Sequence, residues 1–304
     1  MKRFVFCVVI FLLPLVVLSL AAVGVEWSCF RKAVRCPDAW IGVIGDSHPT
    51  CAINPKGHFP GLANFAQVTS QPMVWRAKLS VILEENPKLE AFLIEVWPGC
   101  YYRQTADNAQ GRARYVRGFI PETAVLDVMR TNEMGGLPDT DLTRNFIRGI
   151  IFPFIKRCTT GYSGSALMPG YSALDRKLHD SSWWKSGCKV QKGLFTPVPG
   201  ERNPNRTEIE DCIRMCISKH MRPILLTTPI LPRWRQEAIP QEDWKAFEAE
   251  MNDLCEKYNC QWLDLSDSVT DEELWADDGH LNIKGAAFLR ICCSSRFAIS
   301  LNDR

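Results

Sequence analysis

Two short segments, far apart in the chain, contain residue types that together can carry out acyl transfer. Gly45-Asp46-Ser47 follows an apolar run at 39–44, and Asp277-Asp278-Gly279-His280 comes just before a helix-like stretch near the C-terminus. A serine hydroxyl attacks poorly at neutral pH unless an imidazole accepts its proton and a carboxylate orients that imidazole. A carboxylate three residues before a histidine can fold back onto the ring. The sequence therefore predicts Ser47 as nucleophile, His280 as general base and Asp277 as the orienting carboxylate.

These side chains need a scaffold, and the chain alternates between two kinds of segment. Short apolar runs, typical of buried strands, occur at 39–44, 92–96, 224–228 and 261–265. Stretches with apolar residues at helical spacing occur at 74–83, 207–219, 244–258 and 284–293. This alternation predicts an α/β fold with a mostly parallel sheet covered on both faces. Ligands of such sheets bind beyond the carboxyl ends of the strands, which is where Ser47 is expected.

The helix near residue 207 has a start signal of its own. Thr207 and Glu210 have the spacing of a capping box, in which each side chain accepts a hydrogen bond from the backbone of the other residue. We therefore expect this helix to begin at Thr207. Residues 100–205 instead contain many Gly, Pro and Ser residues with weak periodicity, and we interpret them as an insertion that forms a lid or a substrate-binding region. Trp183-Trp184, within it, is either core or a platform for a sugar ring.

The combination of Gly45-Asp46-Ser47 after the first strand with the late Asp277-Asp278-Gly279-His280 resembles the SGNH (GDSL-like) hydrolase superfamily. The apolar N-terminus and the wording Asp-Gly-His-Leu-Asn at 278–282 are similar to its membrane-anchored, extracytoplasmic branch, which handles acyl groups on envelope polymers. The resemblance implies a flavodoxin-like three-layer α/β/α sandwich with a five-stranded sheet. It also implies the same three roles for Ser47, His280 and Asp277.

The resemblance further implies an oxyanion hole, and here the chain departs from the family pattern. The family uses a glycine N–H after the second strand, but the counterpart from Asn64 to Ser70 has no glycine, so the backbone of Thr69 or Ser70 is expected to donate. The family also uses an Asn side chain after the third strand, where this chain has Trp97. The residues expected to line the oxyanion and substrate site are Asp46, His48, Asn64, Thr69, Ser70, Trp97 and Arg233.

The N-terminus carries an export signal. Residues 4–25 contain no charged side chain, and Lys2 and Arg3 precede them. About 20 such residues cross a bilayer as a helix, and the run is longer than the apolar part of a cleaved signal, so we favour an uncleaved anchor. Cleavage after Ser19-Leu20-Ala21 remains the alternative. Either way, residues 1–25 form the targeting segment, and residues 26–304, with the insertion, lie outside the cytoplasm, membrane-anchored or secreted.

Composition excludes one class of partner and leaves the cysteines open. Lys and Arg number 36 against 34 Asp and Glu, a net charge of +2, so we expect no nucleic-acid partner. The 13 cysteines include no CxxC pair, and His48, Cys51 and His58 do not fit a common zinc spacing, so we expect no metal and no cofactor. In an oxidising compartment Cys29–Cys36 and Cys255–Cys260 are local disulfide candidates, although pairing cannot be deduced from sequence.

Together these observations predict an extracytoplasmic serine esterase or O-acyltransferase that acts on acyl groups of a polysaccharide. Its partners would be the acylated carbohydrate, the membrane and a membrane acyl-donor protein. Two alternatives remain: a glycan-binding protein that keeps the fold without catalysis, and a scaffold subunit of an acylation complex. In those cases Ser47 would be only a turn residue or helix cap, and His280 would only satisfy a loop carbonyl.

Overall fold

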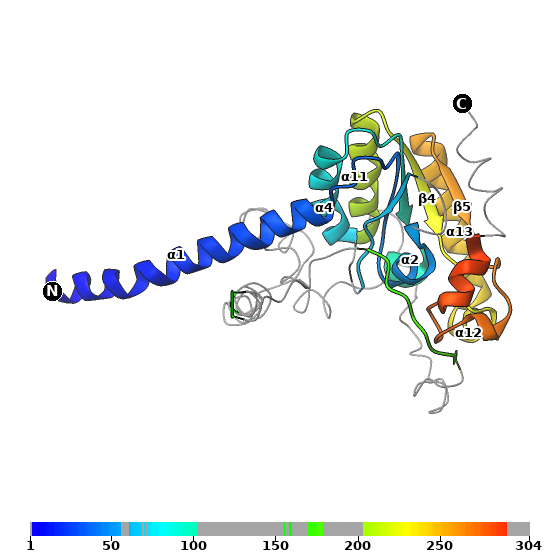
Figure 1. Cartoon of the computed structure of the whole chain (residues 1–304). Coiled ribbons are helices and arrows are strands. Elements are labelled where there is room, and N and C mark those ends of the chain that lie inside the picture. Colours follow the sequence, from blue (N-terminus) through cyan, green and yellow to red (C-terminus); the bar gives the residue numbers. More distant parts are fainter. Residues whose placement is uncertain are drawn as a thin grey trace. The chain divides into compact units, whose positions relative to one another are not determined.

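A computed structural model of the chain describes residues 2–55, 61–68, 70, 72–102, 155, 158–159, 170–178 and 203–290 (Figure 1). The chain divides into two compact units, residues 1–34 with 105–168 and residues 35–104 with 169–304. The first unit contains the helix α1 (Lys2–Ala33), which includes the apolar N-terminal run. Among the described residues, none of the helices combines the length and apolar character needed to cross a membrane.

The second unit is built on a five-stranded sheet in which all neighbouring strands are parallel. This confirms the predicted α/β class. The strand order is β2-β1-β3-β4-β5, the doubly wound order in which the direction of winding reverses between β1 and β3. The strands are β1 (Ile41–Ile44), β2 (Leu62–Asn64), β3 (Ala91–Glu95), β4 (Arg222–Thr227) and β5 (Gln261–Asp264).

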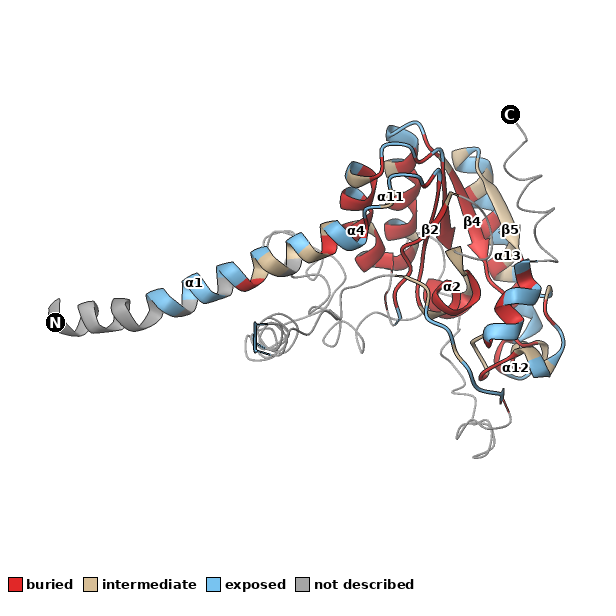
Figure 2. Ribbon diagram, viewed as in Figure 1, coloured by how far each residue is buried: buried red, intermediate tan, exposed pale blue. Residues whose placement is uncertain are grey.

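The centre of the sheet is covered on both sides. Every residue of β1 and β3 is buried, which requires packing against both faces of the sheet (Figure 2). Gly42 allows this close packing, because a Cβ there would come within 2.3 Å of the Phe92 ring on the neighbouring strand. The apolar runs in the sequence therefore form strands whose side chains are buried on both faces of the sheet.

Three long helices lie side by side in the second unit, in the order α4, α11, α13. On α4, Arg76 pairs with Glu208 and Asp211 of α11, and Arg206 of α11 pairs with Glu250 of α13. Helix α4 lies in the connection from β2 to β3, α11 in that from β3 to β4, and α13 in that from β4 to β5. Because such connections between parallel strands are right-handed and all three run in the same direction along the sheet, the three helices lie on the same face. Among the residues of this unit that the structure describes, the helices are α2 (Ser47–Ala52), α4 (Pro72–Glu85), α5 (Pro98–Tyr101), α11 (Pro204–Ser218), α12 (Pro232–Ala238), α13 (Gln241–Tyr258), the 3₁₀ helix η4 (Glu272–Leu274) and a helix at 283–290.

One strand was not among the runs identified in the sequence, and one helix boundary differs from the prediction. The missed strand is β2, a three-residue edge strand that pairs with β1. Helix α11 begins at Pro204 rather than Thr207, because the Asn203 side chain accepts a hydrogen bond from the Asn205 N–H. Proline at the first helical position needs no hydrogen-bond partner for its nitrogen, so the capping-box prediction was wrong.

The cysteines whose side chains the structure describes carry free thiols, so neither of the two candidate pairs is joined in it. Cys255 and Cys260 come closest, with their sulfur atoms 3.7 Å apart at the end of α13.

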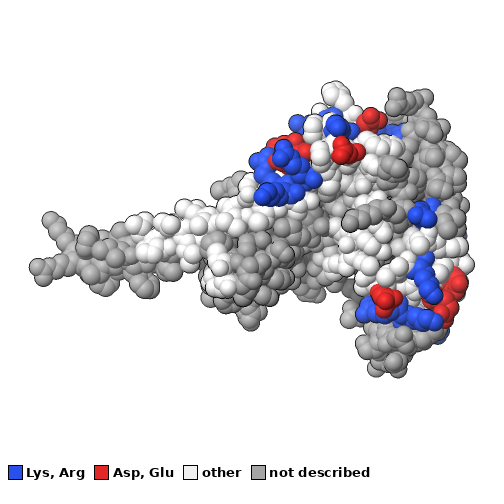
Figure 3. Space-filling model, viewed as in Figure 1, with Lys and Arg blue, Asp and Glu red and all other residues white. Residues whose placement is uncertain are grey.

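On the face drawn in Figure 3, the described Lys and Arg side chains lie among Asp and Glu side chains.

Candidate active site

The candidate site lies where the sheet reverses its winding. Asp46 and Ser47 directly follow β1, and Trp97 follows β3, the strand beside it. The carboxyl ends of these two strands form the crevice in which doubly wound sheets bind their ligands. Gly45 is tightly enclosed here, because a Cβ would lie 2.4 Å from the buried Glu95 carboxylate and 2.5 Å from Pro49. The close packing of Glu95 and Pro49 thus leaves no room for a side chain at the first position of the Gly-Asp-Ser turn.

Ser47 is the first residue of α2, and Asp46 is the helix cap. The Asp46 carboxylate accepts the His48 N–H at 2.8 Å, so the capping role that could have explained Ser47 belongs to its neighbour. Ser47 is half-buried, and its hydroxyl makes no hydrogen bond to the residues that the structure describes. Its side chain is therefore not occupied in holding the turn together.

The late loop holds His280 in one orientation. Nδ1 of His280 lies 2.6 Å from Oδ1 of Asp277, the contact expected from their spacing. The Asp277 carboxylate also accepts the Gly279 N–H at 3.2 Å and a hydrogen bond from Arg176. The other ring nitrogen, Nε2 of His280, is buried and has no hydrogen-bond partner among the described residues. The ring is thus fixed by one nitrogen, and the other is left for a ligand or a nucleophile.

The electrostatics of this pair follow from its contacts. Burial alone would raise the pKa of Asp277, but the His280 ring, the Gly279 N–H and Arg176 lower it to about 2. Burial would likewise lower the pKa of His280, but the hydrogen bond to Asp277 and the nearby carboxylates outweigh it and raise it above 6.5. Asp278, partly buried beside the Asp277 charge, has a raised pKa. Asp277 is therefore the carboxylate that stays ionised against the ring.

His48 joins the two parts of the site. Its ring stacks on His280 with centroids 5.3 Å apart and lies 4.4 Å from Trp97. Its Nδ1 is 2.8 Å from Oδ1 of Asp46, so the site contains a second Asp–His pair. The turn that carries Ser47 and the loop that carries His280 therefore meet. The direct hydrogen bond expected between Ser47 and His280 is not made, although such contacts are often long without substrate.

Two of the residues predicted for the oxyanion and substrate site, Asn64 and Ser70, have hydrogen-bond partners elsewhere. The Asn64 amide donates to the carbonyls of Pro49 and Ile53, and its oxygen accepts the Ala66 N–H. The Ser70 N–H donates to Gln67 and its hydroxyl donates to Gly45. Asn64 and Ser70 therefore support the loops around the site in this conformation, and Thr69 lies outside the described residues.

Trp97 and Arg233 have different positions. The Trp97 indole N–H donates to Oδ2 of Asp46 at 3.2 Å, which places its ring against the site. Arg233 is exposed and pairs with Glu237 on its own helix at 3.0 Å. The structure thus brings Trp97, but not Arg233, to the Asp46 turn.

Asp46, His48 and Glu95 could in principle hold a cation, since their ligand atoms all lie within 4.8 Å of one another. However, Oε2 of Glu95 accepts the Asp46 N–H at 2.6 Å, and Asp46 is paired with His48. Burial and the Asp46 charge raise the pKa of Glu95, which favours a neutral carboxyl there. We therefore interpret the three residues as a hydrogen-bonded support for the turn.

Sequence reasoning missed two contributors, Glu95 and the segment 170–178. This segment, drawn in green beside α2 in Figure 1, donates from Ser172 to the Thr50 carbonyl and from Leu178 to the Trp275 carbonyl. It brings Arg176 to Asp277. It lies in the weakly periodic insertion, so its sequence pattern contained no signal for these contacts. The buried Glu95 at the end of an apolar strand was the one available signal.

The raised pKa of His280 predicts a pH dependence. His280 can accept a proton only when neutral, so the rate should rise with pH through the pKa of His280 in the free enzyme. Because the Asp277 pair raises this pKa, we expect the midpoint of the acid limb of kcat/KM to lie above pH 6.5. A pH–rate profile with a small activated ester measures it. A midpoint below pH 6.5 would show that burial outweighs the Asp277 pair.

Comparisons with known proteins leave the family open. No family model matches the chain, and no curated protein matches it either. Among solved structures, the chain is similar to one from Streptococcus pneumonia that is described, provisionally, as a platelet activating factor. The identity is 12%, the TM-score is 0.44, and the alignment covers 95% of this chain and 98% of that one.

Proposed function

We propose that this protein is a serine esterase or O-acyltransferase, of the SGNH kind, that acts on acyl groups of a polysaccharide. The observation that carries the proposal is the free Nε2 of His280, held by Asp277 on a loop that packs against the Ser47 turn. The order of the sheet and the place of Ser47 after β1 support it. Location outside the cytoplasm rests on the residues of the N-terminal run and stays part of the proposal.

In the proposed reaction, Ser47 attacks the carbonyl carbon of an ester while Nε2 of His280 takes the hydroxyl proton. The tetrahedral intermediate collapses, and the departing alcohol receives that proton from His280. The acyl group, now bound to Ser47, passes to water or to a sugar hydroxyl, with His280 again accepting the proton of the incoming group. Asp277 stabilises the charged imidazole in both halves.

The engaged donors favour a second candidate, a non-catalytic glycan-binding or scaffold protein. The Ser70 N–H and the Trp97 indole N–H, both from residues predicted for the oxyanion and substrate site, already have partners in this conformation. Such a protein would keep the Asp277–His280 pair but leave Ser47 unreactive. It would co-purify with a multi-span acyl donor if it is a scaffold.

Turnover with and without a sugar acceptor tests the proposed function. Losing one oxyanion donor costs about 10²–10³ in kcat in well-studied serine enzymes, so we expect slow hydrolysis of small activated esters. We expect faster release of the leaving group when a carbohydrate acceptor is supplied. Ester turnover of about 10 s⁻¹ or more without an acceptor would show an esterase rather than an O-acyltransferase. A complete lack of turnover in both conditions would favour the non-catalytic candidate.

A further inference from the structure

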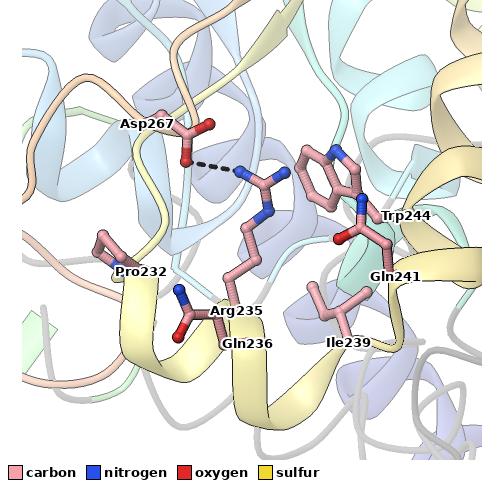
Figure 4. Close-up of a pocket in the computed structure, with 7 residues that line it drawn as sticks. All are labelled: Pro232, Arg235, Gln236, Ile239, Gln241, Trp244 and Asp267. Carbon is pink, nitrogen blue, oxygen red and sulfur yellow. Dashed lines mark hydrogen bonds and ion pairs between the residues drawn. The ribbon is translucent and has the colours of Figure 1, made fainter.

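A pocket with a volume of about 340 Å³ opens next to α12 (Figure 4). This volume falls within the range of about 300–1,000 Å³ that is usual for small-molecule sites. Its lining comes from α12, which follows β4, from the start of α13, and from the turn after β5, so it lies at the same edge of the sheet as Ser47. The side chains that shape it include Arg235, Gln236, Ile239, Gln241, Trp244 and Asp267.

The guanidinium of Arg235 is held in place within this pocket. Nη1 of Arg235 donates to Oδ1 of Asp267 at 2.6 Å, the contact marked in Figure 4. Its Cζ lies 3.8 Å from the centroid of the Trp244 ring, and the Trp244 indole N–H is itself bonded to Glu248 at 2.7 Å. Among the described residues, Arg235 Nε and Nη2 have no hydrogen-bond partner. Two donors in a fixed position are therefore available to a ligand.

The rest of the lining supplies both donors and acceptors. The side chains of Gln236 and Gln241 belong to exposed residues and make no hydrogen bond within the part of the chain that the structure describes. Each amide offers an N–H₂ donor and a carbonyl acceptor. Ile239, only 4% exposed, adds an apolar wall. Because the Arg235 charge is paired with Asp267, the pocket has no net charge.

We propose that this pocket binds a neutral sugar unit of a carbohydrate chain. Sugar hydroxyls both donate and accept, which matches the two amides and the free guanidinium donors, and the C–H face of a sugar ring suits the Ile239 wall. An acyl chain has no hydrogen-bonding groups to match the two amides and the free guanidinium donors. An anionic group would meet the Asp267 carboxylate beside Arg235. The chemistry of the lining therefore selects a hydroxyl-rich, uncharged ligand.

Helix α12 connects the pocket to the candidate site. Trp234, next to Arg235 in sequence, has its ring 6.1 Å from Trp97, whose ring in turn lies 4.4 Å from His48. A carbohydrate chain bound in the pocket would thus lie next to α12, the helix whose Trp234 packs near Trp97 of the candidate site. This inference rests on the proposed function, because it takes the sugar unit to belong to the polysaccharide whose acyl group reaches Ser47.

Titration of the full chain with neutral trisaccharides tests the proposal. Maltotriose, cellotriose and mannotriose are added, and binding is measured by calorimetry. We expect at least one to bind, and the double variant Gln236→Ala/Gln241→Ala to bind it at least tenfold more weakly. Asn252→Ala removes an exposed amide from α13 outside the pocket, and should bind like the wild type.

Three results would overturn the proposal: no binding of any trisaccharide at millimolar concentration, equal binding by the double variant, or tighter binding of trigalacturonic acid than of the neutral sugars. The titration reads binding alone, so it does not depend on the chemistry of Ser47. Ester turnover by the wild type is measured separately. Sugar binding without turnover would refute the proposed function only, and turnover without sugar binding would refute the pocket only.

Discussion

Replacing Ser47 with alanine is expected to reduce hydrolysis of a small activated ester by about 10³-fold or more, and to abolish labelling by a fluorophosphonate. Removing the nucleophile of a serine triad costs about 10⁶ in kcat in a well-studied protease. Because a weak oxyanion site lowers the rate of the wild type, a smaller fall in kcat can be measured here. The Ser47 hydroxyl makes no hydrogen bond to a described residue, so its loss should leave the fold unchanged. Circular dichroism checks the fold.

A matched control separates this effect from general damage. Ser218, at the end of α11, is exposed, and its hydroxyl bonds only to the Met215 carbonyl among the described residues. Ser218→Ala should keep full turnover and labelling. His280→Ala should cost about as much as Ser47→Ala, and the double variant little more, because the two side chains act as one unit. Persistent labelling of the Ser47→Ala variant would show that another residue is the nucleophile.

Replacing Asp277 with asparagine is expected to reduce kcat by about 10³–10⁴-fold. The corresponding change in a serine protease triad costs about 10⁴, because the amide holds the imidazole in the wrong tautomer. Here Nδ1 of His280 has its contact to Asp277 at 2.6 Å, and the loss of the carboxylate would also lower the pKa of His280. The acid limb of the pH–rate profile should therefore shift to lower pH.

Asp278→Asn is the matched control, since it changes the adjacent carboxylate in the same loop. Asp278 acts on the His280 ring only through its charge, the smallest of the contributions that raise the pKa of His280. We expect it to change kcat by less than about tenfold, with the acid limb nearly unmoved. If the two variants lose activity equally, the assignment of Asp277 as the orienting carboxylate is wrong.

Arg176 qualifies how far the Asp277 pair acts alone. Its guanidinium donates to Oδ2 of Asp277 from the segment 170–178, and it contributes to the lowered pKa of that carboxylate. A residue of the insertion thus helps keep Asp277 ionised beside His280. The segment 170–178 therefore acts on the electrostatics of the site.

The sequence alone determined the class of fold and one contact within a local segment, that between Asp277 and His280. Apolar runs of strand length alternating with helical periodicity were enough for a parallel α/β sheet, because burial on both faces leaves a strong pattern. The Asp277–His280 contact could be predicted because the two residues are only three positions apart in one loop. The short edge strand β2 was missed, since three residues carry little pattern, and the start of α11 was misplaced, since the Asn203 cap competes with Thr207.

Only the tertiary structure decided which distant groups meet. Glu95 supports the Asp46 turn, the rings of His48 and His280 stack, and Arg176 reaches Asp277 across about a hundred residues of chain. Such contacts depend on the order of the strands and on the path of an irregular segment, neither of which leaves a periodic signal. The same holds for the engaged N–H groups of Ser70 and Trp97, because a hydrogen-bond donor in the sequence has no visible partner until the chain is folded.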